Sequence, residues 1–139
     1  MKKIKISVKK ILAVISLTTL MVGIMAAPVS ALSPVQSPTL IDGAYAYGSS
    51  TISHAYVSAT TSHNKTSVKQ VQMTGYYKKK DGSYANVSAQ NSTYGLSPAT
   101  VSRWLPSDGD HFYGCISDHW VFADNGASWH DTSSVSISR

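Results

Sequence analysis

The sequence contains no glutamate, a single cysteine and few charged residues. Charged side chains make up only 14% of the 139 residues, and all seven acidic residues are aspartates. Ser, Thr, Tyr and Val, which suit strands, are abundant, whereas good helix formers are scarce. A single cysteine excludes an internal disulfide, so packing or a partner must stabilise the fold. These absences argue against a helical protein and against a disulfide scaffold.

The one long apolar run lies near the beginning of the chain. Five lysines precede the apolar residues 11–25, and small residues follow up to Ala31. This order is typical of a secretory signal peptide of the Gram-positive type, with cleavage expected after Ala31 or, as an alternative, after Ala27. We therefore interpret residues 1–31 as a signal peptide and expect a secreted, extracellular protein with no membrane span after the signal is removed; a retained anchor is the alternative.

Removal of the signal peptide cancels the positive charge of the precursor. Five of the 12 Lys and Arg residues lie in it, so the remaining seven balance the seven aspartates. Only Lys78, Lys79 and Lys80 are adjacent, whereas nucleic-acid binding requires basic residues clustered over one face. We expect no nucleic-acid partner. The rest of the chain is long enough for one domain, predicted over residues 44–139 after an extended lead-in at 32–43.

Apolar and polar residues alternate in several segments with the period of a strand. Residues 51–61, 67–80 and 83–90 show this pattern, and residues 111–124 are expected to form one or two strands. Asp81-Gly82 and Asn125-Gly126 predict hairpin turns, because glycine adopts the positive φ that tight turns require. The side chains predicted to face inward from the first hairpin are Val71, Met73, Gly75, Tyr77, Ala85, Val87 and Ala89.

Two segments suggest other structures. Residues 44–50 are predicted to be a short edge strand closed by Gly48. Ser97 and Pro98 suit the start of a helix, so one short helical turn is predicted near 98–104. Together the elements predict an all-β fold, a small antiparallel β-sandwich of immunoglobulin-like architecture, with a small barrel as the alternative.

The only cysteine lies in a segment rich in histidine and aspartate. Cys115 precedes His119 by four residues, and residues four apart on a strand stand about 13 Å apart. We therefore predict no catalytic residues and no enzyme, and interpret Cys115 as a buried structural thiol. An intermolecular disulfide through Cys115 is one alternative, and a small secreted hydrolase that uses it is another.

Three histidines of this part of the sequence are candidate metal ligands. His111, His119 and His130 are the candidates, since imidazole and nearby aspartates suit zinc. Their spacing matches no compact metal motif. The sequence therefore predicts no metal site and no cofactor.

The aromatic content favours a binding function. Exposed aromatic residues on strands suit recognition of glycans or proteins. We predict a non-catalytic module acting at the bacterial cell surface on a wall component, glycan or protein, without an indication of its oligomeric state. The predicted contacts are Tyr76, Tyr84, Lys78, Lys79 and Lys80. The lysines would approach anionic wall polymers or, alternatively, would discourage edge-to-edge aggregation.

Residues 53–71 resemble part of the lactococcin-type secreted β-sandwich bacteriocins. The matching positions are Ala55-Tyr56, Ser58, His63-Asn64, Lys65-Thr66 and Val68. The resemblance implies a two-sheet sandwich and an antibacterial protein that acts on cell-wall synthesis, at the wall precursor or septum of related bacteria.

Overall fold

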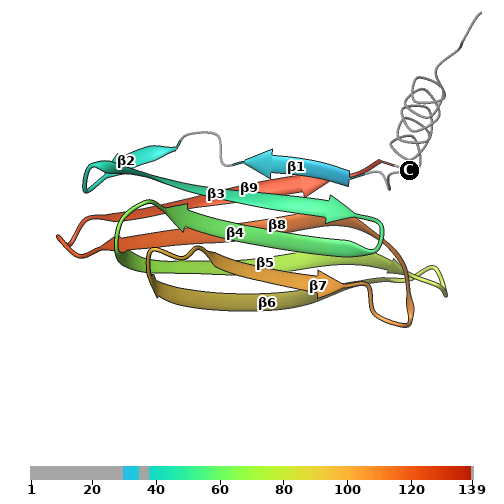
Figure 1. The fold of residues 1–139 in the computed structure, drawn as a ribbon. Coiled ribbons are helices and arrows are strands. Elements are labelled where there is room, and N and C mark those ends of the chain that lie inside the picture. Colours follow the sequence, from blue (N-terminus) through green and yellow to red (C-terminus); the bar gives the residue numbers. More distant parts are fainter. Residues whose placement is uncertain (1–29, 35–37, 139) are drawn as a thin grey trace, which may run out of the picture.

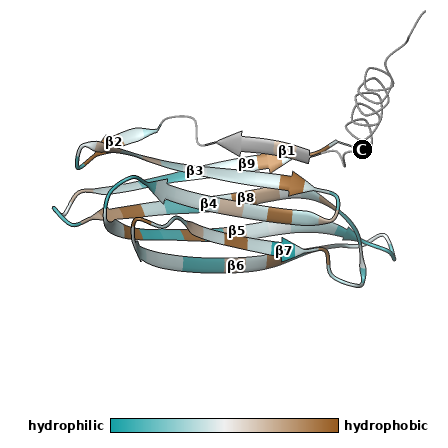
Figure 2. Cartoon of the chain, in the orientation of Figure 1, coloured by the Kyte–Doolittle hydropathy of each residue, from teal (hydrophilic) through white to brown (hydrophobic). Residues whose placement is uncertain are grey.

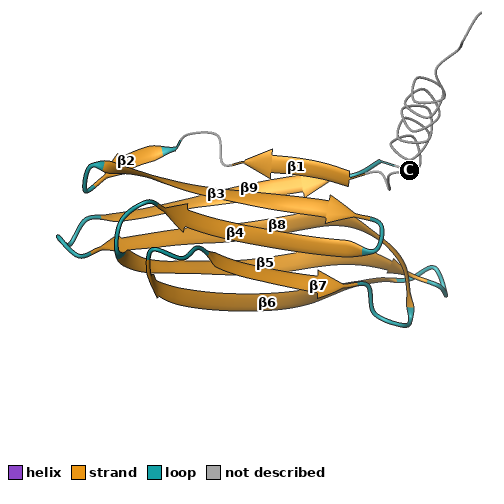
Figure 3. Cartoon of the chain, in the orientation of Figure 1, coloured by secondary structure: helices purple, strands orange, loops and turns teal. Residues whose placement is uncertain are grey.

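The computed structural model describes residues 30–34 and 38–138, and every helix or strand assigned in this part of the chain is a β-strand (Figures 1 and 3). Residues 1–29 of the predicted signal peptide lie outside the described residues. The strands are β1 (Ser30–Pro34), β2 (Thr39–Ile41), β3 (Ala44–Ser53), β4 (Tyr56–His63), β5 (Ser67–Lys79), β6 (Tyr84–Gly95), β7 (Ala99–Trp104), β8 (Gly109–Ala123) and β9 (Ser128–Ser136).

These strands form two antiparallel sheets that pack against each other as two layers (Figure 1). Sheet A has the order β1-β3-β4-β7. It is four strands wide because β1 and β2 pair with successive parts of the same β3 edge, residues 49–53 and 44–46. Sheet B has the order β6-β5-β8-β9. The predicted all-β fold with two antiparallel sheets is confirmed.

The hydrophobic core lies between the sheets and follows the alternation of the strands. On β5, Val71, Met73 and Tyr77 are buried, whereas Gln70 and Gln72 are exposed. Figure 2 shows the resulting mixture of hydrophobic and hydrophilic residues along individual strands. The inward set predicted for the first hairpin is confirmed, since all its members are buried or pack against the core.

Both predicted hairpin turns are present. Gly82 and Gly126 have φ values of +88° and +87°, the left-handed region that favours glycine. The Asp81 carboxylate accepts hydrogen bonds from the backbone N–H and the hydroxyl of Ser83, at 2.8 and 2.6 Å. The turns fix the register of β5 with β6 and of β8 with β9.

The prediction of one strand over residues 51–61 is wrong, because the chain reverses at His54-Ala55. β3 ends at Ser53 and β4 begins at Tyr56. Ile52 and Val57 are both fully buried although they are five residues apart. An odd separation would place them on opposite faces of a single strand, so the reversal is needed to bury both.

The helical turn predicted near 98–104 is also wrong, since these residues form β7. Ala99 and Val101 face the core, and Thr100 and Ser102 face outward against β4. Pairing with β4 and burial of Ala99 and Val101 in the core between the sheets outweigh the helix-start preference of Ser97 and Pro98. Pairing to β4 therefore decides the local structure.

β1 and β2 lie at the beginning of the described chain. β1 includes Ser30 and Ala31 of the predicted signal peptide and extends into the predicted lead-in of residues 32–43, which also contains β2, while residues 35–37 lie outside the described part. Residues 44–50 are no edge strand, because β3 lies between β4 on one side and β1 and β2 on the other. Gly48 lies within β3 and does not close it.

Candidate functional site

The outer face of sheet B carries a regular array of polar and aromatic side chains. Strand register places Gln70 of β5 beside Ser92 of β6 and Trp120 of β8, and places His130 of β9 beside Trp120. These four residues form one row across the sheet, with one residue from each strand. Because alternate residues of a strand share a face, every second residue belongs to another row on the same face. The next rows are Gln90, Gln72, Asp118 and Thr132, then Ser88, Thr74, Ile116 and Ser134, and then Asn86, Tyr76, Gly114 and Ser136.

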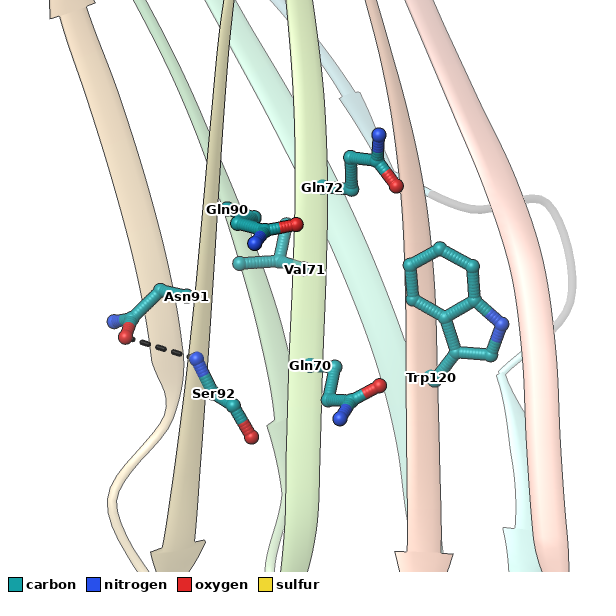
Figure 4. A pocket seen from close by; sticks show the side chains of 7 residues that line it. All are labelled: Gln70, Val71, Gln72, Gln90, Asn91, Ser92 and Trp120. Atoms are coloured by element: carbon teal, nitrogen blue, oxygen red, sulfur yellow. Dashed lines mark hydrogen bonds between the residues drawn. The ribbon is translucent and has the colours of Figure 1, made fainter.

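A shallow hollow of about 410 Å³ lies in this face. We call it the amide hollow, and its lining consists of Gln70, Val71, Gln72, Gln90, Asn91, Ser92 and Trp120. Figure 4 shows the side chains of Gln70 and Gln72 extending from β5 toward the indole of Trp120 on β8. Each glutamine amide offers both donors and an acceptor, so the hollow combines hydrogen-bonding groups of both kinds with one aromatic ring.

Neighbouring side chains on β9 hold the Trp120 ring in place. The His130 imidazole stacks on the indole, with ring centroids 4.9 Å apart and an angle of 15° between the planes. Asp118 lies 3.6 Å from His130 Nε2 and accepts a 2.7 Å hydrogen bond from the Thr132 hydroxyl. The indole is therefore preorganised on a rigid strand, which lowers the entropic cost of binding a ligand.

A second hollow of about 290 Å³ lies further along the same face. We call it the tyrosine hollow, and its lining consists of Tyr76, Tyr113, Gly114, Cys115, Ile116, Ser134, Val135 and Ser136. The Tyr113 ring lies 6.4 Å from Tyr76 and 5.5 Å from Tyr84, measured between ring centroids. Tyr76 and Tyr84, both predicted as contacts, thus belong to one cluster, in which Tyr84 is 65% exposed.

The three lysines of the predicted run have different neighbours. Lys78 lies opposite Tyr84 in the sheet. Lys79 lies 3.2 Å from a carboxylate oxygen of Asp108, and the hydrogen bond and charge of Asp108 raise the pKa of Lys79. Lys80 donates a 2.8 Å hydrogen bond to the carbonyl of Ser107. Two of the three lysines therefore connect the β5–β6 hairpin to the loop between β7 and β8.

The thiol of Cys115 lies in the core, with 1% of the residue exposed. Its Sγ lies 3.7 Å from the hydroxyl of Ser117, and burial raises the pKa of the thiol. A protonated thiol without solvent access is a poor nucleophile. The arrangement supports a structural role and gives no support to cysteine catalysis.

His119 is buried between the sheets, and both its ring nitrogens are hydrogen-bonded. Nδ1 lies 2.8 Å from Thr61 Oγ1 in sheet A, and Nε2 lies 2.8 Å from Ser133 Oγ in sheet B. The Thr61 hydroxyl donates to the carbonyl of Gln70, so a neutral His119 donates from Nδ1 to Thr61 and accepts at Nε2 from Ser133. Burial lowers the pKa of His119 to about 4. This residue ties the two sheets together as a neutral imidazole.

The candidate metal ligands do not converge. His119 is engaged inside the core, while His130 lies on the outer face against Trp120. His111 stands 2.9 Å from an Asp110 oxygen and packs edge-on against His54. Among residues 30–34 and 38–138, no group of three or more His, Cys, Asp and Glu side chains is arranged to hold a metal ion.

A further buried polar cluster contains a lysine that the sequence analysis missed. Lys69 is fully buried, and its ammonium group donates to the carbonyl of Gly95, and to the carbonyl and hydroxyl oxygens of Ser67 at 3.2 and 3.3 Å. His63 lies 3.0 Å from the same hydroxyl. Burial lowers the pKa of Lys69, and the charge of Asp124 opposes this effect. Val71 and Met73 face the core at alternate positions of β5, and Lys69 lies two residues earlier on the same face. The same alternation therefore predicts that Lys69 faces the core.

The amide hollow was also missed, although its pattern is present in the sequence. Gln70 and Gln72 occupy alternate positions of one strand, and Gln90 lies on the partner strand across a tight turn. The N–H of Lys79 donates to the carbonyl of Ser83, and counting back along the two strands from this pair places Gln72 opposite Gln90. The approach of Trp120 depends on pairing between β5 and β8, which are distant in the sequence, and no local pattern predicts it.

Comparison of the chain with models of known families, with curated proteins and with solved structures gives no match. In the part of the chain that the structure describes, no helix is long and apolar enough to span a membrane. We therefore infer the function from the side chains on the outer face of sheet B.

Proposed function

We propose that the protein is a secreted, non-enzymatic binding module that recognises a neutral glycan of the bacterial cell surface through the outer face of sheet B. The observation that carries this proposal is the position of the Trp120 indole beside the amide groups of Gln70 and Gln72 (Figure 4). An aromatic ring offers an apolar surface for the face of a sugar ring, while amides donate to and accept from its hydroxyl groups.

The charges on this face support a neutral ligand. The outward-facing rows that contain Val68, Gln70, Gln72, Thr74 and Tyr76 of β5 include no lysine or arginine, and every residue in them is described. Lys78 lies in the next outward-facing row, opposite Tyr84. Asp118 is the one carboxylate of these five rows, and it is engaged by Thr132 and His130. An anionic polymer would find no lysine or arginine in these five rows to compensate its charge. Neutral hydroxyl and amide groups fit the array better.

A binding comparison between two tryptophans tests the proposal. Purified protein is incubated with chitin, with a neutral β-linked glucan and with purified teichoic acid as the anionic polymer. Trp120→Ala is expected to weaken binding to a neutral polysaccharide at least about tenfold, because it removes an aromatic anchor. Trp104→Ala, which truncates a 72% exposed tryptophan of sheet A, is the matched control and should leave binding unchanged.

Three outcomes count against a neutral-glycan module. These are preference for teichoic acid, equal effects of the two substitutions, and no binding to any of the three polymers. Lys79→Ala serves as a further control, because Lys79 is paired with Asp108 and lies outside both hollows. Circular dichroism of each variant separates loss of binding from loss of fold.

The second candidate function is that of a bacteriocin-like protein acting on the cell-wall synthesis of competing bacteria. The segment that carries the resemblance, residues 53–71, spans the β3–β4 turn, β4 and the crossing from sheet A to β5. A zone of growth inhibition around purified protein on related bacteria supports this function. Unaffected growth of all of them would count against it.

We also propose that the two sheets form an immunoglobulin-like sandwich. An immunoglobulin-like arrangement is supported by two antiparallel sheets between which the chain crosses at residues 64–66, 96–98 and 105–108. An experimental structure tests it through the strand order, because a different order within either sheet would exclude the arrangement proposed here.

A further inference from the structure

The two hollows on the outer face of sheet B lie diagonally across it: the amide hollow is lined mainly by β5 and β6, and the tyrosine hollow mainly by β8 and β9. Trp120 of the amide hollow pairs with Gln70, whereas Ile116 of the tyrosine hollow pairs with Thr74, four residues further along β5. Four residues of an extended strand span about 13 Å, and the six from Trp120 to Gly114 span about 20 Å. The hollows are therefore separated by more than one sugar ring.

The strip between the hollows is mainly polar and contains no aromatic side chain, and Ile116, 42% exposed, is its one large apolar residue. Thr74 and Ser88 are hydrogen-bonded to each other across β5 and β6 at 3.1 Å, and Thr132 is bonded to Asp118 across β9 and β8. These hydrogen bonds hold the short side chains of this strip against the sheet. The larger aromatic rings lie at the two ends, Trp120 at one and Tyr76 with Tyr113 at the other. A ligand that runs from one hollow to the other meets no bulky aromatic side chain in these two rows.

From this geometry we infer that the ligand is an extended linear polysaccharide that runs obliquely across β5 and β8 and occupies both hollows at once. The inference rests on the proposed function and names the form of its ligand. The amide hollow binds one part of the polymer through Trp120 and the glutamines. The tyrosine hollow binds a second part through the rings of Tyr76 and Tyr113, which are 6.4 Å apart.

Occupation of both hollows by one chain has a consequence for affinity. Once the first part of a polymer is bound, binding of the second is intramolecular and proceeds at a high effective concentration. An oligosaccharide too short to reach the second hollow lacks this gain. Affinity is therefore expected to rise steeply at the length that first spans both hollows.

The test measures affinity against the length of the ligand by calorimetry. The probes are neutral β-1,4-linked oligomers of N-acetylglucosamine and of glucose, from the disaccharide to the octasaccharide. For the purified protein we expect affinity for the longest oligomers of one series to exceed that for the disaccharide by at least about tenfold.

A blocking substitution at Gly114 isolates the second hollow. A Cβ at this position would lie 3.8 Å from the nearest atom of Tyr76, an ordinary van der Waals contact, so the backbone accommodates a side chain. Gly114→Leu should fill the tyrosine hollow. The expected result is loss of the affinity gain of long oligomers over the disaccharide. Tyr113→Ala should give the same result by removing the ring instead.

Failure of the inference is distinguishable from failure of the proposed function. If affinity does not rise with length while Trp120→Ala still abolishes binding, the neutral-glycan function stands and the two-hollow ligand is wrong. A steep rise with length that survives both Gly114→Leu and Tyr113→Ala would also overturn the inference. If the unaltered protein binds neither oligomer series nor the neutral polysaccharides, both proposals fail together.

Discussion

The imidazole of His119 lies directly against the Cα of Gly48, so a Cβ on residue 48 would overlap the ring. The two residues belong to different sheets, His119 to β8 and Gly48 to β3. The missing side chain of Gly48 is what allows the imidazole to reach Thr61 in sheet A. The close approach of the sheets and the buried hydrogen-bond network thus depend on the same glycine.

Gly48→Ala is therefore expected to destabilise the protein. The added methyl group must displace the His119 ring, and overpacking of this kind costs about 1–3 kcal/mol. Gly114→Ala is the matched control, because a Cβ there meets only ordinary contacts. Urea unfolding of both variants measures the difference. Equal stability of Gly48→Ala and the unaltered protein would contradict the described packing of His119.

Stability is expected to fall as the pH is lowered from about 6.5 to about 4. The pKa of His119 is about 4 in the folded protein and 6.5 as its ordinary value, so the unfolded chain binds more protons in this range. The contribution of neutral His119 to the free energy of unfolding is present in full above pH 6.5. Acidification to about pH 4 is expected to lower the free energy of unfolding by up to about 3 kcal/mol.

The measurement is the free energy of unfolding as a function of pH, with His119→Gln as the comparison. The glutamine cannot titrate, so its profile should be flatter between pH 4 and 6.5 even where its overall stability is lower. Parallel profiles for the two proteins would show that His119 is not the group responsible.

Cys115 should be unreactive in the folded protein. With 1% of the residue exposed and a pKa raised by burial, the thiol has neither access to reagents nor thiolate character. Alkylation with iodoacetamide is expected to be slow in buffer and complete in denaturant, as followed by mass spectrometry. Rapid labelling of the native protein would reopen the thiol-dependent alternatives, a hydrolase or a disulfide-linked dimer.

Local patterns in the sequence predicted the elements that depend on neighbouring residues. The β5–β6 hairpin follows from the alternation of Val71, Met73 and Tyr77 and from the turn chemistry of Asp81-Gly82. The reversal at His54-Ala55 was missed because apolar and polar residues continue to alternate loosely through it. Only the burial of both Ile52 and Val57 shows that the inward-facing positions change from even to odd residue numbers between the two strands.

Contacts between distant segments account for what the sequence did not predict. β7 becomes a strand because β4 offers it a partner, a pairing that no pattern within residues 98–104 contains. The candidate site likewise needs the register of β5 against β8, which brings Gln70 beside Trp120 across fifty residues of chain. Tyr76 and Tyr84 were predicted as contacts from the aromatic content and from their place near the hairpin tip, and their position in one cluster with Tyr113 depends on that same pairing.

Chemical-shift mapping of the isotope-labelled protein, titrated with a neutral β-linked oligosaccharide that it binds, tests the central claim most directly. A neutral-glycan site on sheet B predicts that the largest changes occur at the indole N–H of Trp120 and the side-chain amides of Gln70, Gln72 and Gln90. The indole of Trp104 on sheet A should remain unperturbed. Changes centred on Trp104 and Tyr56, with the glutamine amides unmoved, would contradict the account.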